Sequence, residues 1–283
     1  MELKSGGLMM IKNVIDDLPN SERKIAKFIL SNPHKFVSLT VSELGELSKT
    51  SSSAVVRLCK SLGLRGYQDL KMRVIGDMNS LNDTSYTDIK KNDTIKSLIQ
   101  SIRNNAVKSI DETMLILDEQ VIKECVELID KANSIVFYGM GASFIAAKDA
   151  QQKFLRINKT SYAFEDTHLT ATTIANLKCN DLVVGISASG ETIEAVKLIE
   201  LANSKNINTI GITKYGKSTL GKASKINLCN PSSIETPFRS AATSSRMSQL
   251  YIIDVLFMCF ATSRYDTTIK YLENTVDAIS FFK

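Results

Sequence analysis

The feature that most constrains the fold of this chain is a change of periodicity near residue 131. Beyond that point five short apolar runs, rich in β-branched residues, alternate with helical stretches; they cover residues 134–138, 161–163, 181–186, 208–213 and 226–229. Strands that alternate with helices form a parallel sheet, because each crossover lays a helix back on the sheet. The sequence therefore predicts a C-terminal α/β domain with an open parallel sheet flanked by helices.

The N-terminal part shows helical periodicity and no strand signal. Its amphipathic segments predict four short helices, which begin after Ser21, after Thr40 or Ser42, near Ser52 and at Tyr67. In the second of these helices Val41, Leu44 and Leu47 form the expected buried stripe. An all-α domain is therefore expected ahead of the α/β domain.

A chain of 283 residues is long enough for two domains, each with its own core. Residues 79–93 are rich in Asn, Asp, Ser and Thr without a clear period, which is typical of a linker. We therefore expect an all-α domain at 1–77, a linker and connecting helix at 78–110, and the α/β domain at 111–283.

Several classes of protein are disfavoured. The apolar stretch 250–261 is short for a membrane span and contains Asp254, and no secretory signal is evident, so a cytoplasmic location is expected. Five scattered cysteines, without a CxxC pair, do not suggest a disulfide framework. With two histidines in the chain, neither a metal site nor a cofactor is expected.

The charge is unevenly distributed. Residues 1–77 hold 12 Lys and Arg against 8 Asp and Glu, whereas residues 78–130 hold 6 against 10. An excess of Lys and Arg in residues 1–77 is typical of a domain that binds a polyanion. Ordinary variation of surface charge explains such a difference about as well.

Residues 42–62 have the features of a helix-turn-helix. Gly45 is the small residue that lets two helices cross closely. The second helix offers hydroxyls and cations to phosphates and base edges, from Ser51, Ser52, Ser53, Arg57 and Lys60. Arg23, Lys24, Arg65 and Lys71 could add nonspecific phosphate contacts. The alternative is a helical interaction module in which the serines only cap a helix.

Two loops of the α/β part each follow an expected strand and open an expected helix: Gly139-Met140-Gly141-Ala142-Ser143 and Ser187-Ala188-Ser189-Gly190-Glu191-Thr192. Amides at the start of a helix favour an anion, and three hydroxyls of the second loop suit the oxygens of a phosphate. The first loop is no dinucleotide fingerprint, because Phe144 occupies the point of the third glycine, and no Walker A loop is present.

The run TVSELGELSKTSSSAVVRLCKSLGLRGYQDLK, residues 40–71, resembles the helix-turn-helix of the RpiR/MurR family of bacterial transcription regulators. It departs from that family at Ala54, where a threonine that would contact DNA is usual. Residues 134–262 resemble a SIS (sugar isomerase) domain, with SASGET matching its phosphate loop.

The resemblance implies which residues bind a sugar phosphate. Those in matching positions are Ser143, Ser187, Ser189, Thr192 and His168. The tract 235–246 resembles the stretch that closes the site; Glu235 is expected at a sugar hydroxyl, and Arg239 either at the phosphate or at an acid of a neighbouring subunit.

The expected protein is thus a regulator of sugar or amino-sugar metabolism genes that binds double-stranded operator DNA, with an inverted repeat, and a sugar-phosphate effector without turnover. A homodimer or a dimer of dimers is expected, because helix-turn-helix domains read half-sites in pairs. One alternative is a SIS-type isomerase or lyase; another is an interaction module that regulates a sugar kinase.

Overall fold

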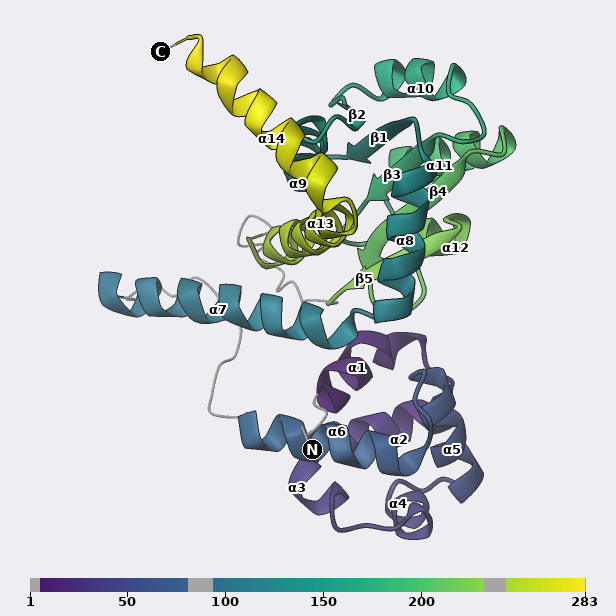
Figure 1. Ribbon diagram of the computed structural model, residues 1–283. Coiled ribbons are helices and arrows are strands. Elements are labelled where there is room, and N and C mark those ends of the chain that lie inside the picture. The colour runs from purple at the N-terminus through teal and green to yellow at the C-terminus, as the bar shows by residue number, and fades with distance from the viewer. Residues whose placement is uncertain (1–5, 81–93, 232–242, 283) are drawn as a thin grey trace. The chain divides into compact units, whose positions relative to one another are not determined.

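The structure is a computed structural model that describes residues 6–80, 94–231 and 243–282. It divides into two compact units, one around Met1–Ile116 and the other around the residues from Leu117 onwards (Figure 1). The expected linker falls largely on residues 81–93, which lie outside the described residues. Within the described part of the chain no helix is long and apolar enough to cross a membrane.

The first unit is helical, as predicted. Its elements are α1 (Gly7–Val14), a 3-10 turn (Ile15–Asp17), α2 (Asn20–Ser31), α3 (Pro33–Phe36), α4 (Val41–Leu47), α5 (Ser52–Ser61), α6 (Tyr67–Ser80) and α7 (Ile95–Ile116). The four predicted helices correspond to α2, α4, α5 and α6. The prediction missed α1 and the single turn α3. The core is apolar and includes fully buried Ile25, Leu44, Leu58 and Leu70.

Local sequence explains where the central helices begin. Thr40 forms a capping box with Glu43: the Thr40 hydroxyl accepts from the Glu43 amide, and the Glu43 carboxylate accepts from the Thr40 amide. This decides between the two caps that the sequence allowed. The predicted buried stripe of α4 was wrong at Leu47, which is 43% exposed, whereas Leu44, one turn earlier, is fully buried.

The second unit contains a five-stranded sheet in the order β2-β1-β3-β4-β5, with every neighbouring pair parallel. The strands are β1 (Ser134–Gly139), β2 (Thr160–Ala163), β3 (Leu182–Ile186), β4 (Asn208–Lys214) and β5 (Ile226–Asn230). Each predicted strand is present, with its ends within one residue of the expected ones. The helices are α8 (Glu119–Lys131), α9 (Ala142–Leu155), α10 (Thr167–Ala175), α11 (Ile193–Ser204), α12 (Thr219–Ala223), α13 (Thr243–Ser263) and α14 (Tyr265–Ser280).

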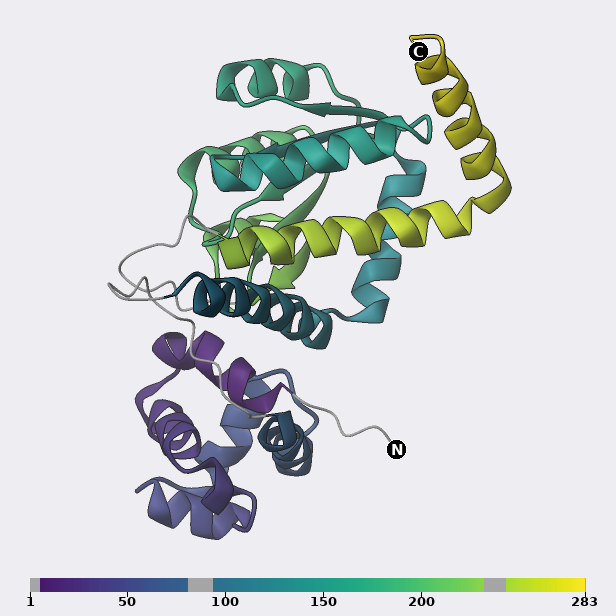
Figure 2. The ribbon, with the colours of Figure 1, turned by 90° about the vertical axis from the view of Figure 1, so that its left-hand side faces the viewer.

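Alternate side chains of the strands enter two separate cores, one on each face of the sheet. Phe137 and Val184 pack with α8, α9 and α13, whereas Val136 and Val183 pack with α10, α11 and α12. Figure 2 shows α9 and α13 side by side over the first of these faces. The predicted α/β architecture is therefore confirmed.

Candidate DNA interface and candidate effector site

The close crossing of α4 and α5 depends on Gly45. A Cβ at this position would lie 3.1 Å from the backbone carbon of Ser51 and 3.1 Å from the backbone nitrogen of Ser52. A side chain here would therefore push the start of α5 away from α4. The structure thus supports the role that the sequence suggested for this glycine.

The three serines at the start of α5 differ in what they do. Ser51 is the N-cap: its hydroxyl accepts from the Ala54 amide at 3.3 Å and lies 2.8 Å from the Ser53 hydroxyl. The Ser52 hydroxyl lies 3.3 Å from that of Ser42. All three serines are exposed, as is Lys60 further along the helix. Ser51 therefore has a structural task as well as a place on the exposed surface of α5.

Arg57, half-exposed on α5, is held from α2 by a buried carboxylate. Its Nε lies 3.7 Å from Oε1 of Glu22, and the Ser61 hydroxyl donates to Oε2 of Glu22 at 2.7 Å. Glu22 is only 3% exposed, so its carboxylate has little access to water. Arg57 and Ser61 supply the polar contacts that a buried carboxylate needs. Sequence reasoning missed Glu22, because its partners are 35 and 39 positions away.

Position 54 does not face solvent. Ala54 is fully buried in the helical core, so a threonine there would also point inward in this structure. The departure from the family pattern at Ala54 therefore removes no hydroxyl from the exposed surface of α5.

Two of the cations suggested for nonspecific phosphate contacts are tied to backbone carbonyls. Arg23 donates to the carbonyls of Ile15, Asp16 and Leu18 at 2.7–3.1 Å. Lys71 donates to the carbonyl of Leu39 at 2.9 Å. Both side chains therefore stabilise the helical unit by joining its segments. The periodicity of the sequence could not predict these contacts.

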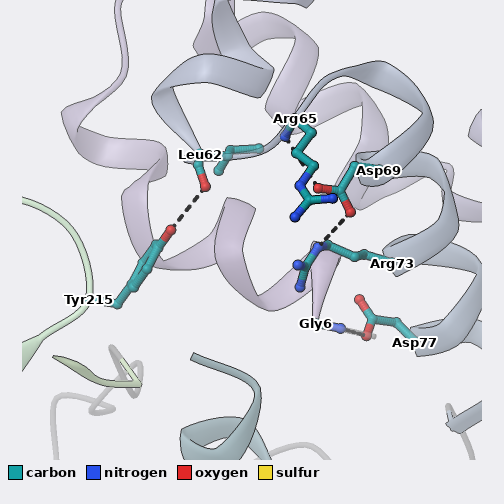
Figure 3. A network of polar contacts seen from close by, with 7 residues as sticks. All are labelled: Gly6, Leu62, Arg65, Asp69, Arg73, Asp77 and Tyr215. Carbon is teal, nitrogen blue, oxygen red and sulfur yellow. Dashed lines mark hydrogen bonds and ion pairs between the residues drawn. The ribbon is translucent and has the colours of Figure 1, made fainter. Parts of the chain in front are cut away.

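A further basic residue, Arg73, forms a pair within α6. Its Nε lies 3.1 Å from Oδ1 of Asp69, and the Arg65 amide donates to the same carboxylate at 3.3 Å (Figure 3). Lys24 and Arg65 are left on the exposed surface.

The two loops of the α/β unit meet at one edge of the sheet. Gly139, the last residue of β1, is in register with Ile186, the last residue of β3. The loops that follow these residues therefore begin side by side at the carboxyl ends of neighbouring strands. Because β1 is followed in the chain by β2 on one side and then by β3 on the other, this is where the strand order reverses. Open α/β sheets bind ligands at such a point.

Three predicted hydroxyls gather in the second loop. The Ser187 Oγ lies 2.8 Å from Oγ1 of Thr192 and 3.4 Å from Oγ of Ser189. Ser187 also accepts from the Gly190 amide at 3.0 Å and is only 2% exposed. The loop thus brings together the three hydroxyl groups that its sequence pattern indicated.

The shape of this loop requires Gly190. Its φ is +71°, in the left-handed region, and a Cβ would collide with the side chain of Ser218. Next to it, the Glu191 carboxylate accepts from the hydroxyl of Thr219 at 2.5 Å and from its amide at 3.1 Å. The hydrogen bond from that hydroxyl is the main cause that lowers the pKa of Glu191 below its usual value. Glu191 therefore holds the loop to α12.

The side chain of Thr192 faces the hydroxyl cluster and does not cap its own helix, although Thr192 is the N-cap residue of α11. The first-turn amides of α11 therefore have no side-chain cap and lie beside the hydroxyl cluster. Amides at a helix start and hydroxyl donors together favour a phosphate.

Ser143, the last residue of the first predicted loop, lies in the first turn of α9 and is 7% exposed. Its hydroxyl accepts a hydrogen bond of 3.0 Å from the side-chain amide of Gln249, a residue of α13 that is 1% exposed. Sequence reasoning missed Gln249. The signal was present, because Ser245, Ser248 and Gln249 interrupt the apolar face of α13 at helical spacing.

The remaining predicted ligand residues are not brought into this cluster by any contact of the described residues. His168 is exposed on the first turn of α10, after the carboxyl end of β2. Glu235 and Arg239 lie outside the described residues.

Metal-binding side chains do not cluster in the described ranges: no group of three or more His, Cys, Asp or Glu could hold an ion. The cysteines there are unpaired, and burial raises the pKa of the Cys59 thiol to about 11.

A helical unit with a helix-turn-helix, joined to an α/β unit with a loop suited to phosphate, defines a class of ligand-responsive transcription regulators. Residues 5–80 match the helix-turn-helix domain of the rpiR family, and residues 128–259 match the SIS domain.

Relatives of full length agree with this class. The chain is 45% identical to the uncharacterized HTH-type transcriptional regulator YbbH of Bacillus subtilis, over 98% of each chain. It is 32% identical to the HTH-type transcriptional regulator HexR of Pseudomonas aeruginosa, over 88% of this chain and 87% of HexR. Among solved structures, the Vibrio vulnificus NanR protein complexed with ManNAc-6P is similar with a TM-score of 0.62 and 26% identity, over 98% of this chain and 99% of NanR. The chain belongs to the rpiR family of helix-turn-helix transcription regulators with a C-terminal SIS domain.

Proposed function

We propose that this regulator binds operator DNA through α5 and releases or engages it in response to a phosphorylated sugar bound, without turnover, at the carboxyl edge of its sheet. The observation that carries this proposal is the cluster of Ser187, Ser189 and Thr192 beside the uncapped start of α11. These groups offer donors to the oxygens of a phosphate group.

The nature of the sugar follows from two considerations. A phosphate occupies only the second loop, so the hydroxyl of Ser143 in the first loop is left for the carbohydrate part of the effector. NanR was solved with ManNAc-6P, which makes an amino-sugar phosphate the first candidate to test. We propose that His168 and Glu235 bind sugar hydroxyls and that Arg239 balances the phosphate charge.

On the DNA side, we propose that Ser52, Ser53, Arg57 and Lys60 contact the major groove and its phosphates, and that Ser51 positions them as the helix cap. The protein acts in the cytoplasm as a homodimer or a dimer of dimers, and the operator is an inverted repeat. An effector changes DNA affinity only if it binds the two conformations of the protein with different affinity.

The competing function is that of a SIS-type isomerase or lyase, which needs a base to move protons between sugar carbons. Sensing is favoured because a DNA-binding domain explains why a sugar-phosphate site exists without turnover. The Glu191 carboxylate, the acid of the second loop, is bound to Thr219 and serves the loop itself.

A thermal-shift screen tests this function. Purified protein is heated with N-acetylmannosamine 6-phosphate, glucose 6-phosphate and a pentose phosphate, and the sugar is recovered and analysed. We expect one of these compounds to raise the unfolding temperature and to be recovered unchanged. The double variant Ser187→Ala/Ser189→Ala should lose the shift. A shift that persists in this variant would place the site elsewhere, and a converted sugar would favour the enzyme.

A further inference from the structure

The face of α13 that packs against the rest of the α/β unit changes character along its length. Its later turns bury Ile252, Ile253 and Leu256, whereas its first turns bury Ser245, Ser248 and Gln249, which are 5%, 2% and 1% exposed. Burying polar side chains is unfavourable unless they form hydrogen bonds. The polar part of this face therefore calls for polar partners near the start of α13.

One such partner is Ser143. The side-chain amide of Gln249 donates to its Oγ at 3.0 Å, across 106 positions of sequence. This contact links α13 to the first loop at the edge of the sheet, beside the loop of Ser187. Gln249 thus reaches the candidate effector site through Ser143, while remaining fully buried itself.

The direction of this hydrogen bond matters for what Ser143 can do. A serine hydroxyl has one proton and two lone pairs. Because one lone pair accepts from Gln249, the Ser143 proton is not directed at the Gln249 amide, and among the described residues no acceptor is given for it. The hydroxyl therefore keeps its proton for a ligand, in the directions that the hydrogen bond from Gln249 leaves open.

We propose that Gln249 is a positioning residue of the effector site: it fixes the Ser143 hydroxyl as a hydrogen-bond donor to an oxygen of the carbohydrate part of the effector. This inference rests on the proposed function, since it requires that a phosphosugar binds at this edge. It adds Gln249, on the buried face of α13, to the site that the sequence had predicted from the two loops, His168 and the tract 235–246.

The test is a double-mutant cycle on the full-length protein. Binding of N-acetylmannosamine 6-phosphate and glucose 6-phosphate is measured by calorimetry for the wild type, Gln249→Met, Ser143→Ala and the combination of both. Methionine keeps the length of the side chain and removes the donor. We expect Gln249→Met alone to weaken binding of the phosphosugar about 3- to 10-fold, as for the loss of one hydrogen bond. In the Ser143→Ala background the same substitution should have no further effect.

Two further variants separate positioning from folding. Gln249→Glu keeps the shape but presents a carboxylate that accepts from Ser143, which reverses the hydrogen bond, so this variant should bind more weakly than Gln249→Met. Leu256→Met, on the apolar part of the same face, should leave affinity unchanged. If Gln249→Met weakens binding equally with and without Ser143, or not at all, Gln249 does not act through Ser143. If the wild type binds neither sugar phosphate, the proposed effector class fails together with this inference; if it binds, only the role of Gln249 is at stake.

Discussion

The Glu22 carboxylate, buried in α2, accepts a hydrogen bond of 2.7 Å from the Ser61 hydroxyl in the last turn of α5. The same carboxylate lies 3.7 Å from the Nε of Arg57, which is one turn earlier in α5. One buried acid thus fixes the helix that presents the DNA-binding residues, at two points along its length.

Glu22→Ala should therefore destabilise the helical unit. It removes the acceptor for Ser61 and the partner of Arg57, and the expected loss is about 1–3 kcal/mol of unfolding free energy. Urea denaturation followed by circular dichroism measures it. Glu22→Gln retains an acceptor for Ser61 and should lose less. Equal urea midpoints for the wild type, Glu22→Ala and Glu22→Gln would show that Glu22 does not stabilise the helical unit.

Gly45→Ala should open the crossing of α4 and α5. The added Cβ meets backbone atoms at 3.1 Å, and backbone cannot rotate away as a side chain can. Overpacking of this kind costs about 1–3 kcal/mol, and displacement of α5 should also weaken DNA binding. Thermal unfolding and fluorescence anisotropy with operator DNA check both effects. The matched control is Glu46→Ala, an exposed neighbour on α4, which should change neither quantity.

Ser51 and Lys60 should separate stability from DNA binding. Loss of the N-cap in Ser51→Ala should cost about 1 kcal/mol of stability. Lys60→Ala, at an exposed position, should leave stability unchanged but weaken binding to all duplexes and reduce the slope of log affinity against log salt by about 1. A salt titration of DNA binding measures this slope; an unchanged slope would remove Lys60 from the interface.

The Glu191 contact predicts a pH dependence of stability. Because Thr219 lowers the pKa of Glu191 in the folded protein, the ionised carboxylate contributes stability that is present above its ordinary value of 4.5 and is lost as the pH falls through the lower folded value. The difference in unfolding temperature between the wild type and Glu191→Gln should therefore shrink below pH 4.5. Glu200→Gln, on the exposed side of α11, is the control. A difference that is constant from pH 7 to pH 3 would contradict this account.

Local patterns predicted the elements well, where the signal itself is local. The β-branched runs located all five strands, and Ser51 and Gly45 marked the helix-turn-helix. The helix α1 was missed because Gly6 precedes it, Gly7 is its first residue, and no side chain caps it. The division of the chain at 77/78 and 110/111 stays a prediction.

The parts of the sites that could not be predicted depend on contacts between distant residues. Glu22 is an ordinary surface acid by its sequence context and becomes a buried anchor only through α5. Gln249 is similar, since only the packing of α13 against α9 brings it to Ser143. The roles of Ser143, Ser187, Ser189, Thr192 and His168 in binding a ligand remain predictions, as do those of the DNA-binding residues.

The most direct test is a binding assay with purified protein and duplexes that tile the region upstream of its own gene and its neighbours. Fluorescence anisotropy is measured at physiological salt, with and without N-acetylmannosamine 6-phosphate and glucose 6-phosphate, and the sugars are analysed afterwards. We expect one duplex with an inverted repeat to bind with a Kd of about 10 nM or lower, and one phosphosugar to change that Kd at least about 5-fold while remaining unconverted. Failure to bind any duplex, together with conversion of a phosphosugar, would show that the protein is an enzyme and not a regulator.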